Sequence, residues 1–196
     1  MENKEYQLDD LITGEYANQN ALLHGSRANY GRHAHYLFKK IRSIALNYEA
    51  KTMVDYGAGK GTLKIAFEVA DSILEEPMNI VITEFDPAFK KLKHLPASAD
   101  LIVCLDVMEH VEEDKVDNTI SFISSITQKA AYFTISTRLS KKSLPNGQNA
   151  HITVHDETWW TEKLEKHFVI IDLEITRKGE LRYEVVPKVI DNLVQD

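Results

Sequence analysis

The sequence VDYGAGKG at residues 54–61 is the strongest indication of the fold, because an apolar run there is followed by glycines at alternate positions, Gly57, Gly59 and Gly61. Glycine adopts backbone conformations that side chains disfavour, and it lets a ligand approach the main chain closely. Residues 52–56 before the glycines predict a short buried strand, and a helical stripe of apolar residues follows them. A strand, a glycine turn and a helix in this order predict a crevice into which free backbone N–H groups point.

Strand and helix patterns alternate outward from this turn. Further strands are expected at residues 79–85, 100–107 and 130–137, and helices at 28–47, 63–74 and 116–126. Residues 138–155 predict a long loop, Asp156 is expected to cap a helix, and strands at 169–175 and 181–186 predict a terminal hairpin. The alternation predicts an α/β fold with a mostly parallel sheet, helices on both faces, and ligands at the carboxyl ends of the strands.

The composition of the chain disfavours several classes of protein. The chain has 196 residues and a formal net charge of −7, which gives no electrostatic footprint for nucleic acid. Cys104 is the single cysteine, so an intrachain disulfide and a cysteine-based zinc site are excluded. The start of the sequence is polar and residues 101–105 are too short an apolar run to span a membrane, so a cytoplasmic protein is expected. We expect an N-terminal segment at 1–27 and one domain at 28–196, and a homodimer stays open.

An acidic partner for the glycine turn stands at the end of the next strand, in Glu84-Phe85-Asp86-Pro87. A carboxylate at this position can accept hydrogen bonds from both hydroxyls of a ribose. Asp86 is the stronger candidate and Glu84 the weaker one, and Asp86 is also placed to cap a helix before Pro87. The spacing G-x-G-x-G differs from the G-x-G-x-x-G of pyrophosphate sites, which disfavours a nicotinamide-dependent oxidoreductase.

Three motifs in order, VDYGAGKG, EFDP and LDVMEHV at residues 105–111, resemble the class I S-adenosylmethionine-dependent methyltransferases over residues 28–190. With LPNGQNAHITV and the following Trp pair, they look like a little-characterised group of bacterial and phage methyltransferases. The resemblance implies a Rossmann-like doubly wound fold of seven strands with a last antiparallel strand. It also implies S-adenosylmethionine as methyl donor, S-adenosylhomocysteine as product, and an O or N atom of a small-molecule or sugar-like acceptor.

The resemblance also implies the residues that hold the cofactor. The glycines would pass beneath its methionine part, Asp55 would hold the amino group, Asp86 would bind the ribose, and Arg32 would pair with the carboxylate. A surface arginine on an amphipathic helix is the other interpretation of Arg32. The full implied set is Asp55, Gly57, Ala58, Gly59, Gly61, Glu84, Asp86, Pro87, Asp106, Val107 and Arg32.

One departure from the family pattern lies between Asp86 and Asp100, where only AFKKLKHLPASA is present. This stretch can hold a short helix and little else, so the third strand of the family is expected to be missing or vestigial. The adenine contact that follows that strand in the family has no direct equivalent, and residues 96–99 or Leu105 are its candidate substitutes.

The acceptor is expected near His110, which follows the third predicted strand, and His151, which lies in the long loop. An imidazole titrates in the range that suits a general base, so both are candidate catalytic residues, with His155 and Asp106 as runners-up. A histidine that only supports the Glu109 loop is the alternative for His110. One residue of the pair Trp159-Trp160 is expected in the core, and the other over the substrate pocket or at the helix–sheet interface.

Two further functions stay open. Asp106, Glu109, His110 and His151 resemble the metal-binding E-x-x-E-H…H set of small-RNA 2′-O-methyltransferases, in which a divalent ion would acidify a ribose hydroxyl. Aspartate in place of the first glutamate departs from that set, and we favour a site without metal. A non-catalytic module that binds S-adenosylmethionine, or a partner subunit of an enzyme, is the other alternative.

Overall fold

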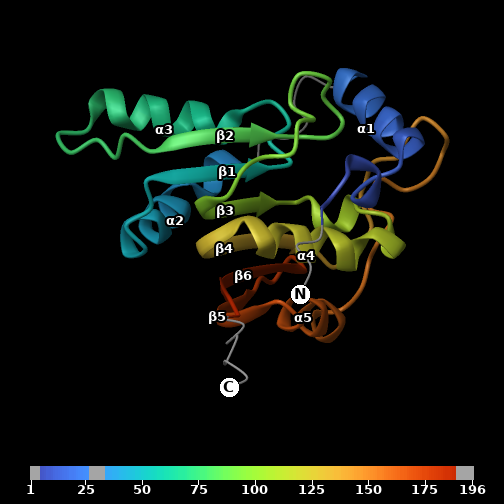
Figure 1. Ribbon diagram of the computed structural model, residues 1–196. Coiled ribbons are helices and arrows are strands. Elements are labelled where there is room, and N and C mark those ends of the chain that lie inside the picture. Colours follow the sequence, from blue (N-terminus) through green and yellow to red (C-terminus); the bar gives the residue numbers. More distant parts are fainter. Residues whose placement is uncertain (1–4, 27–33, 189–196) are drawn as a thin grey trace.

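The computed structural model describes residues 5–26 and 34–188, in which six strands form one sheet (Figure 1). The strands are β1 Thr52–Tyr56, β2 Val81–Phe85, β3 Ala99–Leu105, β4 Thr127–Ser136, β5 Phe168–Ile175 and β6 Glu180–Pro187. The helices are α1 Gly14–Ser26, α2 Ala34–Asn47, α3 Thr62–Ile73, α4 Val116–Ile126 and α5 Glu157–Glu165, with short 3-10 turns at Leu8–Asp10, Met108–His110 and Glu113–Lys115.

The strand order β2-β1-β3-β4-β6-β5 explains where a ligand can bind. Strands β2, β1, β3 and β4 are parallel, whereas β6 runs antiparallel between β4 and β5. The predicted mostly parallel sheet with a C-terminal antiparallel hairpin is therefore confirmed. The chain leaves β1 toward β2 and then crosses to β3 on the other side, so a crevice opens at the carboxyl ends of β1 and β3.

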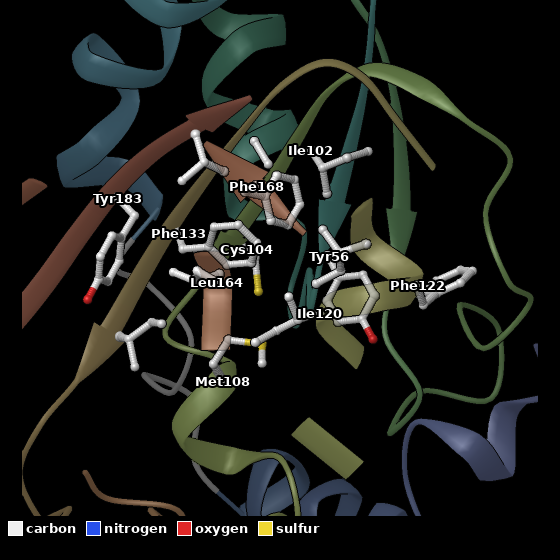
Figure 2. Packing of buried hydrophobic residues seen from close by; sticks show 14 of the residues in the cluster. Tyr56, Ile102, Cys104, Met108, Ile120, Phe122, Phe133, Leu164, Phe168 and Tyr183 are labelled. Carbon is white, nitrogen blue, oxygen red and sulfur yellow. The ribbon is translucent and has the colours of Figure 1, made fainter. Parts of the chain in front are cut away.

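Successive strand residues point to opposite faces, and each face is covered by two helices. Met53, Leu101 and Val103 belong to an apolar cluster with residues of α2 and α3. Ile102 and Cys104 belong to the other cluster, with residues of α4 and α5 (Figure 2). Because both faces of the central strands are buried, they are nearly continuous apolar runs, as parallel strands usually are.

The third strand of the family pattern is absent, as the sequence predicts, and β3 directly follows a run of turns at residues 86–98. The short helix that this stretch could hold is not formed. The N–H of Asp86 donates to the carbonyl of Leu92, and the N–H of Leu92 donates to the carbonyl of Phe89, so the segment folds back on itself. These turn hydrogen bonds replace a helical ladder and leave β2 as the edge of the sheet.

The N-terminal segment contains a helix, α1, that the sequence pattern did not indicate. Tyr16 and Leu23 of α1 pack against Leu144 and Ala150 of the long loop, so contacts distant in sequence stabilise this weakly amphipathic helix. The helix expected at 28–47 is present from Ala34 onward, and residues 28–33 lie outside the described ones.

The end of the long loop matches the prediction at Asp156, whose carboxylate accepts a hydrogen bond from the N–H of Trp159 at 3.0 Å. Trp160 is fully buried in the core, as expected for one of the two Trp residues. Trp159 instead stacks on His155, with ring centroids 3.9 Å apart. Among the described residues, no helix has both the length and the apolar composition needed to cross a bilayer.

Candidate functional site

A cavity of about 600 Å³ opens at the carboxyl ends of β1, β2, β3 and β4. In Figure 1, α1 lies on the same side of the sheet as these strand ends. Among the residues that the sequence singles out, the cavity wall contains Asp55, Gly57, Gly59, Asp86, Pro87, Asp106, Val107, His110 and His151. Ala58, Gly61 and Glu84 do not line it, and Arg32 lies outside the described residues. The volume is in the range of small-molecule sites, about 300–1,000 Å³.

The glycine turn is held open toward the cavity by its backbone conformation. Gly57, Gly59 and Gly61 all have positive φ angles, of 81°, 55° and 68°. The N–H groups of Gly57 and Ala58 both donate to the carbonyl of Phe85, so the turn is fixed to the end of β2. A Cβ on Gly57 would collide with the side chain of Val107, which makes glycine necessary at this close approach.

Asp86 lies directly against this turn. Its Oδ2 accepts a hydrogen bond from the N–H of Gly59, and its Oδ1 accepts one from the N–H of Ala88, both at 2.9 Å. Burial raises the pKa of Asp86, and the two N–H donors oppose that shift. A carboxylate has about four acceptor positions, so acceptor capacity is left for the two hydroxyls of a ribose.

Asp55 lies near the carboxyl end of β1 and is buried, with 4% of its surface exposed. Burial, with smaller contributions from the charges of Glu84 and Asp86, raises the pKa of Asp55 to about 7. A cationic group bound nearby would stabilise the ionised form of this carboxyl.

Glu84 occupies the other side of the glycine turn. Its carboxylate contacts the position where a Cβ of Gly61 would lie, and it pairs with the Lys64 ammonium at 3.7 Å. It borders a second, smaller hollow beside the start of α3 and not the large cavity. Of the two carboxylates considered for the ribose contact, only Asp86 therefore faces the cavity.

The end of β3 places two more carboxyl groups on the cavity wall. Asp106 has a positive φ of 53°, and its Oδ1 accepts a hydrogen bond from the hydroxyl of Thr134 at 2.8 Å. Glu109 is fully buried, and its Oε1 accepts a hydrogen bond from the N–H of Ser136 at 3.1 Å. Burial and the neighbouring Asp106 carboxylate hold the pKa of Glu109 well above its ordinary value.

His110 and His151 are brought together by hydrogen bonds between two distant segments. The N–H groups of Ile152 and Thr153 both donate to the carbonyl of Glu109, and Nδ1 of His110 lies 2.6 Å from the carbonyl oxygen of Ala150. The two imidazole rings consequently meet edge to face, with centroids 4.8 Å apart. The structure thus unites in one cavity two histidines that are 41 positions apart in the sequence.

The ring nitrogens of both histidines have defined roles in this arrangement. Nδ1 of His151 lies 2.7 Å from the carbonyl oxygen of Arg138, and a carbonyl can only accept, so Nδ1 carries the proton in both rings. In the neutral form, Nε2 of each ring then carries the lone pair. Burial lowers the pKa of His151.

His155, the runner-up base, lies outside the cavity. Its Nε2 contacts the Glu113 carboxylate at 3.1 Å, and its ring stacks on Trp159. Trp159 does not line the cavity either, so neither Trp covers a substrate there.

Sequence reasoning missed several lining residues. Ser136 ends β4 and could have been found by the strand-end argument that identified Asp86. Leu11 and Ile12 line the cavity from the N-terminal segment, which is held by hydrogen bonds from the N–H and hydroxyl of Thr13 to the Glu112 carboxylate, at 2.7 and 2.8 Å. No local pattern signals such a contact across 99 positions.

Charge is unevenly distributed over the cavity wall. Carboxyl groups lie at the ends of β1, β2 and β3, whereas Arg138, Lys141 and Lys142 all lie on the segment that follows β4. Glu180 of β6 also lines the cavity, and its carboxylate pairs with the guanidinium of Arg182 at 2.6 Å. The strand-end part of the cavity is therefore suited to a cation, and the other part to a group that carries negative charge.

Comparisons with known proteins give matches by structure and not by sequence. No family model matches the sequence, and no curated protein matches it significantly. A 1,6-didemethyltoxoflavin-N1-methyltransferase from Burkholderia thailandensis, solved with bound 1,6-didemethyltoxoflavin and S-adenosylhomocysteine, has a TM-score of 0.61 at 15% identity, and the match covers 95% of this chain and 93% of that chain.

Two further solved structures are similar over most of both chains. DhpI in complex with S-adenosylhomocysteine has a TM-score of 0.59 at 11% identity, with 90% of this chain and 98% of that chain covered. Magnesium protoporphyrin IX methyltransferase from Synechocystis PCC 6803, with bound S-adenosylhomocysteine, has a TM-score of 0.55 at 16% identity and coverages of 88% and 97%. At these identities the similarity establishes the architecture alone: this chain has the fold of the S-adenosylmethionine-dependent methyltransferases.

Proposed function

We propose that this protein transfers a methyl group from S-adenosylmethionine to an O or N atom of a small-molecule or sugar-like acceptor. The observation that carries the proposal is the contact between Asp86 and the N–H of Gly59 on the wall of the cavity. It joins an open glycine turn to a buried carboxylate with spare acceptor capacity, which is the arrangement that a nucleoside sugar requires. The shared fold and the S-adenosylhomocysteine bound by similar structures support the choice of cofactor.

The charge of the cavity supports S-adenosylmethionine over a dinucleotide. Asp55, Asp86 and Asp106 all line its strand-end part. S-adenosylmethionine carries a sulfonium and an ammonium group, so these carboxylates would attract it, whereas they would repel the pyrophosphate of a dinucleotide. In this arrangement Asp55 would hold the ammonium group and Asp86 the ribose.

The transfer itself needs alignment more than activation, because the sulfonium cofactor already carries an electrophilic methyl group. A lone pair of the acceptor forms the new bond to the methyl carbon, and the electron pair of the broken C–S bond stays on sulfur as a neutral thioether. A hydroxyl acceptor must also lose its proton. Nε2 of His110 and of His151 are the candidate proton acceptors, because both rings line the cavity beside one another.

The size of the cavity, about 600 Å³, favours a small acceptor. Leu11 and Ile12 cover part of it, which fits a molecule that enters the cavity better than a nucleic acid strand that passes over it. We therefore rank an RNA acceptor below a small molecule. A non-catalytic binding module remains the alternative in which the cofactor binds and no methyl group is transferred.

Isothermal titration calorimetry with S-adenosylmethionine, S-adenosylhomocysteine and NAD⁺ tests the proposal. We expect both sulfur compounds to bind and NAD⁺ not to bind. In thermal unfolding, a ligand present at 100 times its Kd is expected to raise the free energy of unfolding by about 2.7 kcal/mol. The pKa of Asp55 is raised to about 7, and a bound ammonium group favours the ionised carboxyl. The affinity for S-adenosylmethionine is therefore expected to rise as the pH passes upward through the neutral range, with proton release on binding.

Absence of binding for both sulfur compounds would end the proposal. Binding without turnover on any acceptor of a broad panel of hydroxyl and amine compounds would favour the non-catalytic module.

A further inference from the structure

A group of cationic side chains lies on one wall of the cavity. Arg138, Lys141 and Lys142 stand close together in the sequence, on the segment that follows β4, and all three line the cavity. We call residues 138–142 the basic segment. The whole chain has a net charge of −7, so this concentration of positive charge runs against its overall composition.

Ion pairs within the protein do not use up the charge of the basic segment. Among the residues that the structure describes, Arg138 and Lys141 form no ion pair. Glu180 of β6 also lines the cavity, but its carboxylate pairs with the guanidinium of Arg182 at 2.6 Å. The cationic groups of the basic segment are therefore available to a ligand.

Asp106 and Glu109 are the acidic groups at the end of β3, between the glycine turn and the basic segment. Burial and the charge of Asp106 hold the pKa of Glu109 well above its ordinary value, so the uncharged form of Glu109 is favoured. The positive charge of the basic segment consequently exceeds the negative charge that these two carboxyl groups place beside it.

The basic segment is fixed to the loop that carries His151. The Oδ1 of Asn149 accepts hydrogen bonds from the N–H groups of Ser140 and His151, both at 2.9 Å, and its Nδ2 donates to the Ser140 carbonyl at 2.8 Å. The N–H of Ala150 donates to the carbonyl of Lys142. The backbone that carries the cationic side chains is therefore held in one position relative to His151.

Both candidate proton acceptors lie against the basic segment. Nδ1 of His151 lies 2.7 Å from the carbonyl oxygen of Arg138, and Nδ1 of His110 lies 2.6 Å from that of Ala150, which is itself bonded to Lys142. Burial is the main cause of the lowered pKa of His151, and the charges of Arg138 and Lys142 add to it. An anionic group bound to the basic segment would thus lie beside the two imidazoles.

The place of the basic segment in the sheet separates it from the groups proposed to hold the cofactor. Asp55 lies near the end of β1 and Asp86 follows β2, whereas β4 is two strands away from β1 in the order β1-β3-β4. Neighbouring strands lie about 4.8 Å apart, so about 10 Å separate the end of β4 from the end of β1. The basic segment is therefore placed to contact the acceptor and not the cofactor.

We propose that the methyl acceptor is a small anion, with a carboxylate or phosphate group beside the hydroxyl or amine that receives the methyl group. This inference rests on the proposed function and specifies its acceptor. Arginine binds both kinds of oxyanion through paired N–H donors, and lysine binds them as a point charge. With the anionic group against the basic segment, the neighbouring hydroxyl or amine is held toward Nε2 of His110 and His151.

The test uses three small hydroxyl compounds that differ in one group: glycerol 3-phosphate, glycerate and glycerol. Each is titrated into the ¹⁵N-labelled full chain at low ionic strength, with and without saturating S-adenosylhomocysteine, and amide chemical shifts give the Kd. We expect at least one of the anions to bind about 10-fold or more tightly than glycerol. The more tightly bound anion shows whether the site is suited to a phosphate or a carboxylate.

Replacement of Arg138 by glutamine is expected to weaken binding of that anion by about 10-fold, because a hydrogen bond to a charged group is lost. Arg177→Gln is the matched control, since it removes the same charge from a residue outside the cavity, and its affinity is expected to equal that of the wild type. Both variants should keep the wild-type affinity for S-adenosylhomocysteine within about twofold. Lys141→Gln is a second variant, and both Arg138 and Lys141 are exposed, so neither change removes a core contact.

Three results would overturn the anionic acceptor: no binding of either anion, equal affinity for glycerol and both anions, or undiminished anion affinity in both Arg138→Gln and Lys141→Gln. Competition between the anion and S-adenosylhomocysteine would also overturn it, because the basic segment would then hold the carboxylate of the cofactor. Failure of the wild type to bind S-adenosylhomocysteine rejects the proposed function. In that case the titrations without cofactor still show whether the basic segment binds anions.

Discussion

Replacement of Asp86 by asparagine is expected to raise the Kd for S-adenosylhomocysteine by about 10- to 100-fold. Hydrogen bonds to a charged group contribute about 1.5–3 kcal/mol, and about 1.4 kcal/mol corresponds to a factor of 10 in affinity. The asparagine also has one acceptor oxygen where the carboxylate has two, so it cannot serve both Gly59 and Ala88 as Asp86 does. Calorimetry on the wild type and the variant gives the two Kd values.

Glu84→Gln is the matched control for this prediction, because Glu84 stands two positions earlier and faces Lys64 instead of the cavity. Its affinity is expected to remain within about twofold of the wild type, as is usual where no ligand contact is lost. Thermal unfolding of both variants without ligand separates a loss of binding from a loss of fold. An unchanged Kd in Asp86→Asn, or a larger loss in Glu84→Gln, would take the ribose contact away from Asp86.

Replacement of His151 by alanine is expected to lower kcat by about 10²- to 10⁴-fold on any hydroxyl acceptor that gives turnover, the range typical of a lost general base. His151 acts on the acceptor in this account, so the Kd for S-adenosylhomocysteine should change little. His155→Ala, outside the cavity, should keep the wild-type kcat. Steady-state rates with saturating cofactor measure the effect.

The pH profile tests the role of His151 as a base. A base works in its deprotonated form, and burial lowers the pKa of His151 below its ordinary value. We therefore expect kcat to rise with pH, with an inflection below pH 6.5, the ordinary histidine value, and we expect that inflection to be lost in His151→Ala. A kcat that is unaffected by His151→Ala would exclude His151 as the base.

The sequence predicts the sheet well because its central strands are buried on both faces. Runs such as residues 101–105 are strongly apolar, and the actual β3, Ala99–Leu105, differs from the expected range by a few residues. The region of 86–98 is also predicted in outline, since its shortness excludes the third family strand. Helix α1 could not be predicted from the sequence, because its Tyr16 and Leu23 are buried by contacts with Leu144 and Ala150, which lie far away in the chain.

Some residues of the candidate site could be located from the sequence, and others could not. Residues at strand ends, such as Asp86 and Asp106, can be located from sequence, because parallel strands bring their carboxyl ends to one edge. The pairing of His110 with His151 depends on how a long irregular loop returns to the sheet, through hydrogen bonds to the Glu109 carbonyl that no local pattern indicates. The direction of the Glu84 side chain is likewise set by Lys64 and by the space beside Gly61.

A crystal structure of the complex with S-adenosylhomocysteine would place the ribose and the sulfur of the cofactor relative to Asp86 and the two histidines. We expect both ribose hydroxyls to lie within hydrogen-bond distance of the Asp86 carboxylate, the amino group to lie near Asp55, and the sulfur to face the side of the cavity with His110 and His151. A ligand bound elsewhere on the chain, or a ribose held by Glu84 with Asp86 turned away from the glycine bend, would contradict this expectation.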